Sequence, residues 1–229
     1  MNDRSINVKA NFEKKALDYD NFMIKCIPDY FEMLGCMINV LPFNSADKLK
    51  ICDLGSGTGN VTQLLLETFP NAEITCVDIS EAMTDMAKAK LEGENVKYEI
   101  SDFYDYEFCE KYDLIISSVA LHHIITDEDK KDFYKKIFAA LKTDGVFYNA
   151  DVIIAATEHA EERTMEKWKT WLRQFHSEED MMEMVINRYY EEDKPTTIVN
   201  HLNWMQEIGF RNVDVIWKRV KGVVYGGTK

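Results

Sequence analysis

A glycine-rich stretch, DLGSGTG at residues 53–59, lies between an apolar run and a helical pattern that begins at Asn60. Three glycines at every second position let a backbone turn sharply and approach a ligand closely at the start of a helix. A plain strand-to-helix turn needs no such spacing. We therefore interpret residues 53–59 as a ligand-binding loop.

Short β-branched runs alternate with longer helical patterns on both sides of this loop, from Lys48 to about Ile154. We expect strands at 49–54, 73–78, 96–101, 112–118 and 145–154. We expect helices at 60–69, from a Ser80 cap to Gly93, and at 127–142 after a Thr126 cap. Strands separated by helices of this length form right-handed βαβ units and a parallel sheet.

The chain closes with a helix between Pro195 and Gly209 and two further strands, 210–220 and 222–227. Their connection is too short for a parallel crossover, so the two strands pair as an antiparallel hairpin. The expected fold class is α/β: a doubly wound, mostly parallel seven-stranded sheet that ends in an antiparallel hairpin.

Helical segments flank this core. Residues 7–40 predict helices interrupted at Pro28, and we expect 1–47 to form an N-terminal helical cap on the main domain at 48–229. A charge-rich helical insertion at 157–194 follows the fifth strand. We interpret it as a substrate lid that excludes water. The alternative is a homodimer contact.

Composition excludes several classes of function. The 229 residues are 46% hydrophobic and 12% aromatic, which is typical of a folded domain. The net charge of -13 disfavours nucleic acid as a partner. No apolar run is long enough for a membrane span. The five cysteines form no CxxC pair and the N-terminus lacks a signal-peptide pattern, so we expect a cytoplasmic protein.

The glycine spacing and two acidic residues indicate an adenosine site. The dinucleotide motif G-x-G-x-x-G would need glycine at Asn60 or Thr62, which favours a nucleoside without phosphates. Asp78 ends the second strand, where a carboxylate accepts hydrogen bonds from both ribose hydroxyls. Asp102 ends the third, within reach of an adenine amino group, with Phe103 beside the ring.

These features resemble the class I S-adenosylmethionine-dependent methyltransferases, through DLGSGTG, Asp78, SDF at 101–103 and YDLIISSVALHHI at 112–124. The resemblance covers roughly residues 48–154 and 196–227. It implies methyl transfer from S-adenosyl-L-methionine to a small-molecule acceptor, with S-adenosyl-L-homocysteine as product. The implied cofactor-binding residues are Asp53, Gly55, Ser56 and Gly57 at the methionine end, Asp78 and Ile79 at the ribose, Asp102 and Phe103 at the adenine, and Ser118.

The run YDNFMIKCIPDY at 19–30 is also similar to the carboxy-S-adenosylmethionine synthase branch and its uncharacterised methyltransferase neighbours. That resemblance implies cofactor binding by Tyr30 and Arg188. Since that branch has a different glycine loop, we expect ordinary methyl transfer. A synthase-like enzyme with an acidic cosubstrate is one alternative, and a non-catalytic cofactor-binding module is another.

Methyl transfer from a sulfonium depends mainly on alignment, and a general base helps only when the acceptor carries a proton. His122 and His123 follow the fourth strand, so we expect at most one of them as that base. The alternative is that both pack the turn. Tyr148 and Asp151 are weaker candidates for acceptor contacts. The spacing of these histidines and Asp151 matches no strong metal-ligand pattern, so no metal is expected.

Arg188 in the insertion has two interpretations. It clamps a carboxylate of the substrate through two parallel hydrogen bonds, or it pairs with Glu192 four residues later on the same helix.

Overall fold

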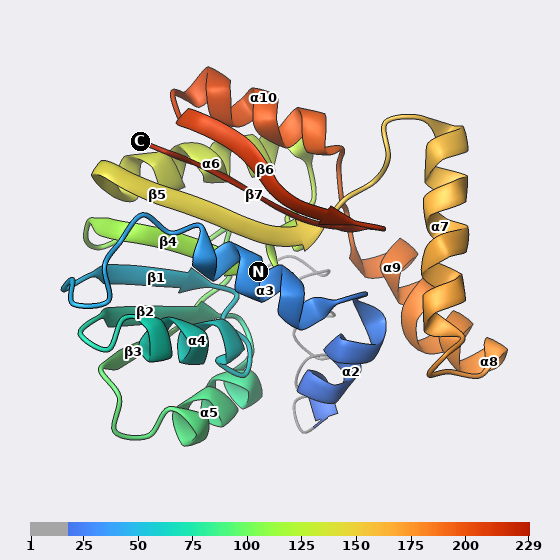
Figure 1. The fold of residues 1–229 in the computed structure, drawn as a ribbon, viewed down its shortest axis with the longest axis horizontal. Coiled ribbons are helices and arrows are strands. Elements are labelled where there is room, and N and C mark those ends of the chain that lie inside the picture. The colour runs from blue at the N-terminus through green and yellow to red at the C-terminus, as the bar shows by residue number, and fades with distance from the viewer. Residues whose placement is uncertain (1–17) are drawn as a thin grey trace.

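A seven-stranded sheet runs through the computed structural model, which describes residues 18–229 (Figure 1). The strand order is β3-β2-β1-β4-β5-β7-β6. Strands β1 to β5 are parallel, whereas β7 runs antiparallel to both β5 and β6. The predicted fold class is confirmed. The strands are β1 (Lys50–Leu54), β2 (Glu73–Asp78), β3 (Val96–Ile100), β4 (Tyr112–Ser118), β5 (Leu141–Val152), β6 (Arg211–Arg219) and β7 (Gly222–Thr228).

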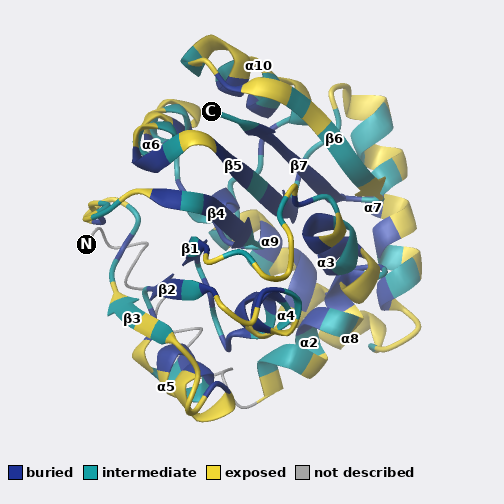
Figure 2. Ribbon diagram, turned by 60° about the vertical axis from the view of Figure 1, so that its left-hand side comes forward, coloured by how far each residue is buried: buried dark blue, intermediate teal, exposed yellow. Residues whose placement is uncertain are grey.

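Helices cover both faces of the sheet, because neighbouring strand residues send their side chains to opposite sides. Ile116 packs with apolar residues of α3 and α4, and Ile115 packs with those of α6 and α10. Figure 2 shows the central strands as largely buried and the helices as exposed along their outer sides. The helices of this core are α3 (Tyr30–Asn39), α4 (Asn60–Thr68), α5 (Glu81–Lys90), α6 (Asp127–Ala140) and α10 (Ile198–Ile208).

Helix boundaries follow the predicted caps. The Ser80 hydroxyl accepts a hydrogen bond from the backbone N–H of Met83, and Thr126 accepts one from Asp129. The predicted start of the fifth strand is wrong. Strand β5 begins at Leu141, directly after α6, because Leu141 already pairs with Tyr112 and a bulge absorbs the following turn-like residues before regular pairing resumes.

The insertion is helical as predicted, and it packs against the N-terminal helix α2 (Tyr19–Cys26). The indole N–H groups of Trp168 and Trp171 donate hydrogen bonds of 2.8 and 2.9 Å to the carbonyls of Cys26 and Lys25. The insertion consists of α7 (Glu158–Leu172), α8 (Glu178–Met181), a π-helical turn (Met182–Ile186) and α9 (Asn187–Glu192).

The predicted break at Pro28 separates α2 from α3, whereas the part of that prediction on residues 1–17 lies outside the described residues. Helix α3 packs against β5, β6 and β7. Within residues 18–229, none of the helices combines the length and the apolar character needed to cross a bilayer.

Candidate functional site

The glycine loop adopts a backbone that only glycine tolerates well. Gly55, Gly57 and Gly59 have positive φ angles of 70°, 53° and 83°. A Cβ on Gly55 would lie 2.2 Å from the Cβ of Ala120, which follows β4. The loop therefore packs tightly against the end of β4. The backbone N–H of Gly55 donates a hydrogen bond to the carbonyl of Val77 on β2.

Asp78 connects the loop to the end of β2. Its Oδ2 accepts a hydrogen bond of 2.8 Å from the backbone N–H of Gly57, and its Oδ1 accepts one from Ser80. The half-buried Ile79 follows it. The carboxylate is thus held at the carboxyl edge of the sheet beside the loop.

Two further carboxylates at this edge have oxygens with no hydrogen-bond partner among residues 18–229. Asp53 accepts from the hydroxyl of Thr62 through Oδ2, but its buried Oδ1 has no partner. Burial raises the pKa of Asp53 to about 7. Asp102 accepts from the N–H of Tyr104 through Oδ1, and its Oδ2 is likewise buried without a partner. Such oxygens are acceptors ready for a polar ligand.

Tyr30, Phe103 and Ser118 surround the same loop. Burial raises the pKa of the Tyr30 hydroxyl to about 12, while the nearby side chains of Asn60 and Ser118 act in the opposite direction. The Phe103 ring lies 3.5 Å from the position that a Cβ on Gly55 would take. The structure therefore brings together the residues predicted to bind the cofactor.

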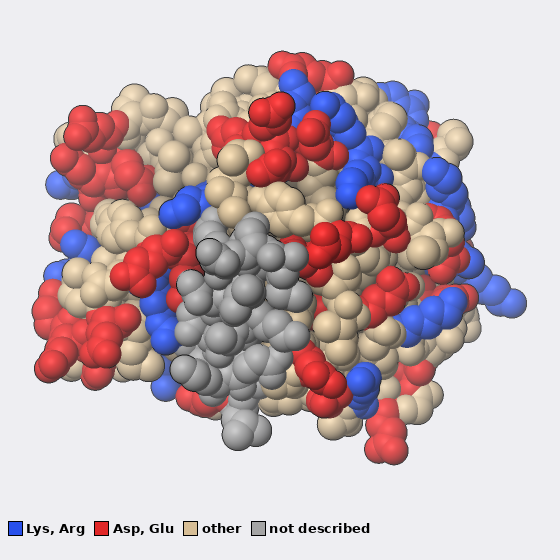
Figure 3. Space-filling view, turned by 180° about the vertical axis from the view of Figure 1, so that it is seen from behind, with Lys and Arg blue, Asp and Glu red and all other residues tan. Residues whose placement is uncertain are grey.

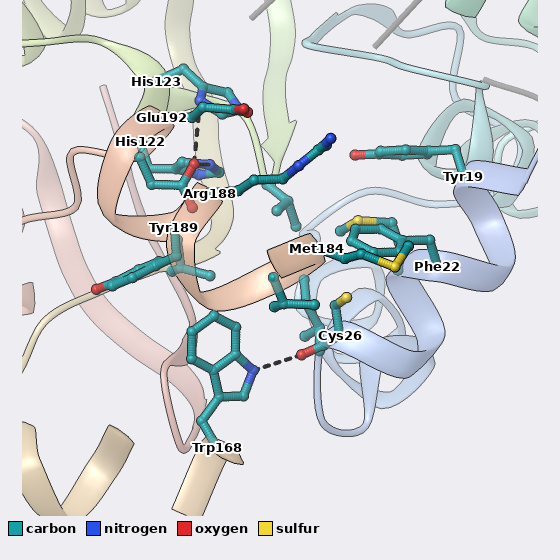
Figure 4. Close-up of a pocket in the computed structure, with 16 residues that line it drawn as sticks. Tyr19, Phe22, Cys26, His122, His123, Trp168, Met184, Arg188, Tyr189 and Glu192 are labelled. Carbon is teal, nitrogen blue, oxygen red and sulfur yellow. Dashed lines mark hydrogen bonds and ion pairs between the residues drawn. The ribbon is translucent and has the colours of Figure 1, made fainter. Parts of the chain in front are cut away.

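A cavity of about 110 Å³ adjoins the loop, between α2, the end of β4 and the insertion (Figure 4). The guanidinium of Arg188 points toward the hydroxyl of Tyr19 across this cavity. Its Nη1 is buried and has no hydrogen-bond partner in the described part of the chain. The guanidinium is turned toward Tyr19 and away from Glu192, which favours the first of the two sequence interpretations (Figure 4).

The two histidines lie on the wall of this cavity, in the 3₁₀ turn Leu121–His123. Nδ1 of the buried His122 lies 2.5 Å from Oδ1 of Asp151 on β5. Nε2 of His122 lies 3.4 Å from Oδ1 of Asp193, and Nδ1 of His123 lies 3.6 Å from the same oxygen. Burial lowers the pKa of His122, but Asp151 and then Asp193 outweigh it and raise the pKa to about 10.

Comparison with known proteins agrees with this geometry. The family model described as a methyltransferase domain matches residues 51–145. A malonyl-acyl-carrier-protein O-methyltransferase of Acetivibrio thermocellus is 32% identical over 146 residues, which are 64% of this chain and 49% of that protein. A carboxy-S-adenosyl-L-methionine synthase of Nautilia profundicola is 26% identical over 210 residues, covering 90% of this chain and 88% of that protein.

Residues 51–145 form a methyltransferase domain, and the relatives that the chain resembles support the class I S-adenosylmethionine-dependent methyltransferases.

Solved structures show the same fold. The complex titled DhpI-SAM-HEP has a TM-score of 0.66 at 18% identity and covers 100% of this chain and 99% of its own. PigF with SAH has a TM-score of 0.66 at 13% identity, over 98% of this chain and 62% of its own. The chain spans about half the length of the malonyl-acyl-carrier-protein O-methyltransferases that it matches.

S-adenosylmethionine is the cofactor of this family, and the described residues fit it. Asp53 lies near the end of β1 and Asp102 lies just after β3, and each has one buried oxygen without a hydrogen-bond partner among the described residues. An ionised Asp53 would offer a negative charge to an ammonium group, and Asp102 would offer an acceptor to an amino group.

Tyr148, which was predicted to contact the acceptor, does not line the cavity that Arg188 enters. The ring of Tyr148 lies against Gly226 of β7 instead. Asp151 does not line the cavity but binds His122, which does. The side-chain amide of Asn149 donates a hydrogen bond to Asp151.

Sequence reasoning missed Asp20 on α2. Its Oδ1 accepts hydrogen bonds from the Thr58 hydroxyl at 2.5 Å and from the Asn60 amide at 2.8 Å. Its Oδ2 pairs with Lys90 of α5. Helix α2 is thereby tied to the glycine loop, and no local spacing in the sequence signals a contact between segments so far apart.

Proposed function

We propose that this chain transfers a methyl group from S-adenosyl-L-methionine to a small molecule that carries a carboxylate or a similar anionic group. The observation that carries the proposal is the buried, unpartnered Nη1 of Arg188 in the cavity beside the glycine loop. A guanidinium binds a carboxylate through two parallel hydrogen bonds. A cavity of about 110 Å³ suits a small acceptor group.

The proposed roles at the cofactor follow the geometry of the edge. Asp53 and the loop hold the methionine end, Asp78 holds the ribose, and Asp102 with Phe103 holds the adenine. Tyr30 and Ser118 close the loop side, which the nearness of Tyr30 to both Asp53 and Ser118 supports. Asp20 keeps α2 against the loop.

Alignment is the main contribution that we propose for the enzyme. The acceptor oxygen, the methyl carbon and the sulfur must lie in line, and such positioning supplies roughly 7–11 kcal/mol. An anionic oxygen attacks without losing a proton, so this acceptor needs no general base. For an acceptor that keeps its proton, His123 would be the base, because His122 is already held between two carboxylates.

The insertion is proposed as the lid of this site. Its α7 is fastened to α2 by the two tryptophan hydrogen bonds, and its α9 carries Arg188 into the cavity. A closed wall of this kind excludes water from the sulfonium. A homodimer contact on its outer face stays a prediction, which sedimentation velocity tests.

Nucleic acid is disfavoured as the acceptor. Figure 3 shows acidic side chains spread over one face, with lysine and arginine scattered among them, in keeping with the net charge of -13. We also propose a cytoplasmic location, which the five free cysteines support.

A second candidate is carboxyl transfer to the cofactor, as in the synthase relative. It is favoured by a similarity that covers 90% of this chain and by Tyr30 beside the glycine loop. The third possibility is a non-catalytic cofactor-binding module, which turnover of any acceptor would exclude.

The test is methyl transfer from isotopically labelled S-adenosylmethionine to a panel of small mono- and dicarboxylates, their thioesters and their methyl esters. We expect product from free carboxylates and none from the methyl esters. Arg188→Met should raise KM for the acceptor by at least about tenfold, because the variant loses a hydrogen bond to a charged group. It should leave the affinity for the cofactor unchanged. Arg163→Met, an exposed arginine of the same insertion, is the matched control. An Arg188→Met enzyme with an unchanged KM would contradict the proposal.

A further inference from the structure

We propose that His122, His123 and Asp193 form a binding site for a divalent transition-metal ion, with zinc as the best match to the ligands. One donor atom of each residue lies within 4.8 Å of the others. Oδ1 of Asp193 is 3.4 Å from Nε2 of His122 and 3.6 Å from Nδ1 of His123. Ligand atoms bound at about 2.0–2.2 Å in a tetrahedron lie roughly 3.3–3.6 Å apart.

The orientation of His122 is the second observation. Asp151 binds its Nδ1 at 2.5 Å and also accepts a hydrogen bond from its backbone N–H, which leaves Nε2 directed at Asp193. A carboxylate behind the far nitrogen of a histidine is the usual support of a metal ligand, because it fixes the ring and raises its basicity.

Support for this arrangement extends into the core. The side-chain amide of Asn149 donates to Asp151 and to the hydroxyl of Tyr225, and that hydroxyl meets Tyr134 at 2.6 Å. All of these side chains are buried. A buried chain of hydrogen bonds of this length holds one imidazole in one position.

Charge also favours a divalent ion. The carboxylates of Asp151 and Asp193 both lie against the ring of His122. Glu192 adds a third carboxylate beside His123 (Figure 4). One divalent cation cancels the charge of the two aspartates.

The position of the cluster suggests a role. Its three ligands line the same cavity as Arg188. Three protein ligands are typical of zinc sites that leave one coordination position for substrate or water. We infer that the ion binds an oxygen of the anionic acceptor opposite Arg188. This role rests on the proposed function, whereas metal binding itself does not.

The test uses the full chain without a histidine tag, stripped with a chelator and titrated with cobalt(II), a spectroscopic substitute for zinc. We expect one equivalent to bind with micromolar or tighter affinity, a visible ligand-field band, and displacement by zinc. His123→Ala and Asp193→Asn should each weaken binding at least about 100-fold, and Asp151→Asn by about 10–100-fold. His159→Ala, an exposed histidine of α7, should bind like the unaltered protein.

Three results would overturn the site: no cobalt binding at about millimolar concentration, equal binding by Asp193→Asn, or a thiolate charge-transfer band, which would place the ion at a cysteine. Circular dichroism and thermal unfolding show whether each variant folds. If metal binds but the stripped enzyme turns over the acceptor with the same KM, the inferred role is wrong while the metal site and the methyltransferase function stand.

Discussion

The backbone N–H of Gly57 donates a hydrogen bond of 2.8 Å to Oδ2 of Asp78, which joins the glycine loop to the end of the neighbouring strand. The other carboxylate oxygen is held by the N–H of Ser80. A carboxylate has about four acceptor positions, so such a group can hold loop contacts and a ribose hydroxyl together. The ribose-binding group is thus positioned before any cofactor arrives, which lowers the ordering cost of binding.

Replacing Asp78 by Ala should weaken binding of S-adenosylmethionine and S-adenosylhomocysteine at least tenfold, because a charged hydrogen bond contributes about 1.5–3 kcal/mol. Calorimetric titration measures both ligands. Asp85→Ala, an exposed position in the helix that follows, should leave both affinities unchanged. Equal binding by Asp78→Ala would remove the ribose role.

Asp20→Ala should weaken cofactor binding about three- to tenfold. The change removes the hydrogen bonds to Thr58 and Asn60, so α2 is no longer tied to the loop. The control is Asp18→Ala, because the Asp18 carboxylate accepts a hydrogen bond from Asn21 of its own helix region. Unchanged affinity in Asp20→Ala would show that α2 is not part of the cofactor site.

The free energy of unfolding should depend on pH through Asp53. Burial raises its pKa from 3.8 to about 7, so the folded state binds a proton more tightly than the unfolded state. The stability contributed by that proton is full below about pH 4 and is lost as pH rises toward about 7. Urea unfolding should therefore show Asp53→Asn gaining stability relative to the unaltered protein as pH increases over this range.

The same ionisation should affect cofactor binding in the opposite direction. A positively charged methionine end favours the Asp53 carboxylate, so affinity should increase between about pH 6 and pH 8, with release of a proton. Asp53→Asn should bind weakly and without this slope. If the affinity of the unaltered protein does not change with pH, the positive charge of the cofactor does not bind at Asp53.

The hairpin strand β7 should be sensitive at Gly226. A Cβ there would lie 2.2 Å from the Tyr148 ring and 2.3 Å from the carbonyl of Phe147. Gly226→Ala should lower the free energy of unfolding by about 2–4 kcal/mol. Gly35→Ala, in α3 with nothing within 4 Å of the new Cβ, should raise it by about 0.5–1 kcal/mol. Denaturant unfolding of both variants measures these changes. Equal free energies of unfolding for Gly226→Ala and Gly35→Ala would contradict the prediction.

Local pattern was enough to predict the sheet, the hairpin and the helix caps, because each depends on residues close in sequence. The start of β5 was missed because Lys142 to Gly145 has the composition of a turn but forms a bulge within the strand. The bulge depends on pairing with β4, which no local pattern encodes.

Part of the site could be predicted from local pattern, and part of it depends on the fold. The residues at strand ends, such as Asp53 and Asp78, were predictable because parallel strands end at one edge. The cluster of His122, Asp151 and Asp193 was not, since its members come from three segments that only the fold brings together. Sequence spacing considered Asp151 as a ligand, whereas the structure places it behind the histidine.

The central claim is that the glycine loop binds S-adenosylmethionine, and calorimetric titration of the unaltered chain tests it most directly. We predict one site that binds S-adenosylmethionine and S-adenosylhomocysteine with micromolar affinity and binds NAD at least tenfold more weakly. Failure to bind either ligand, or a preference for NAD, would contradict the account.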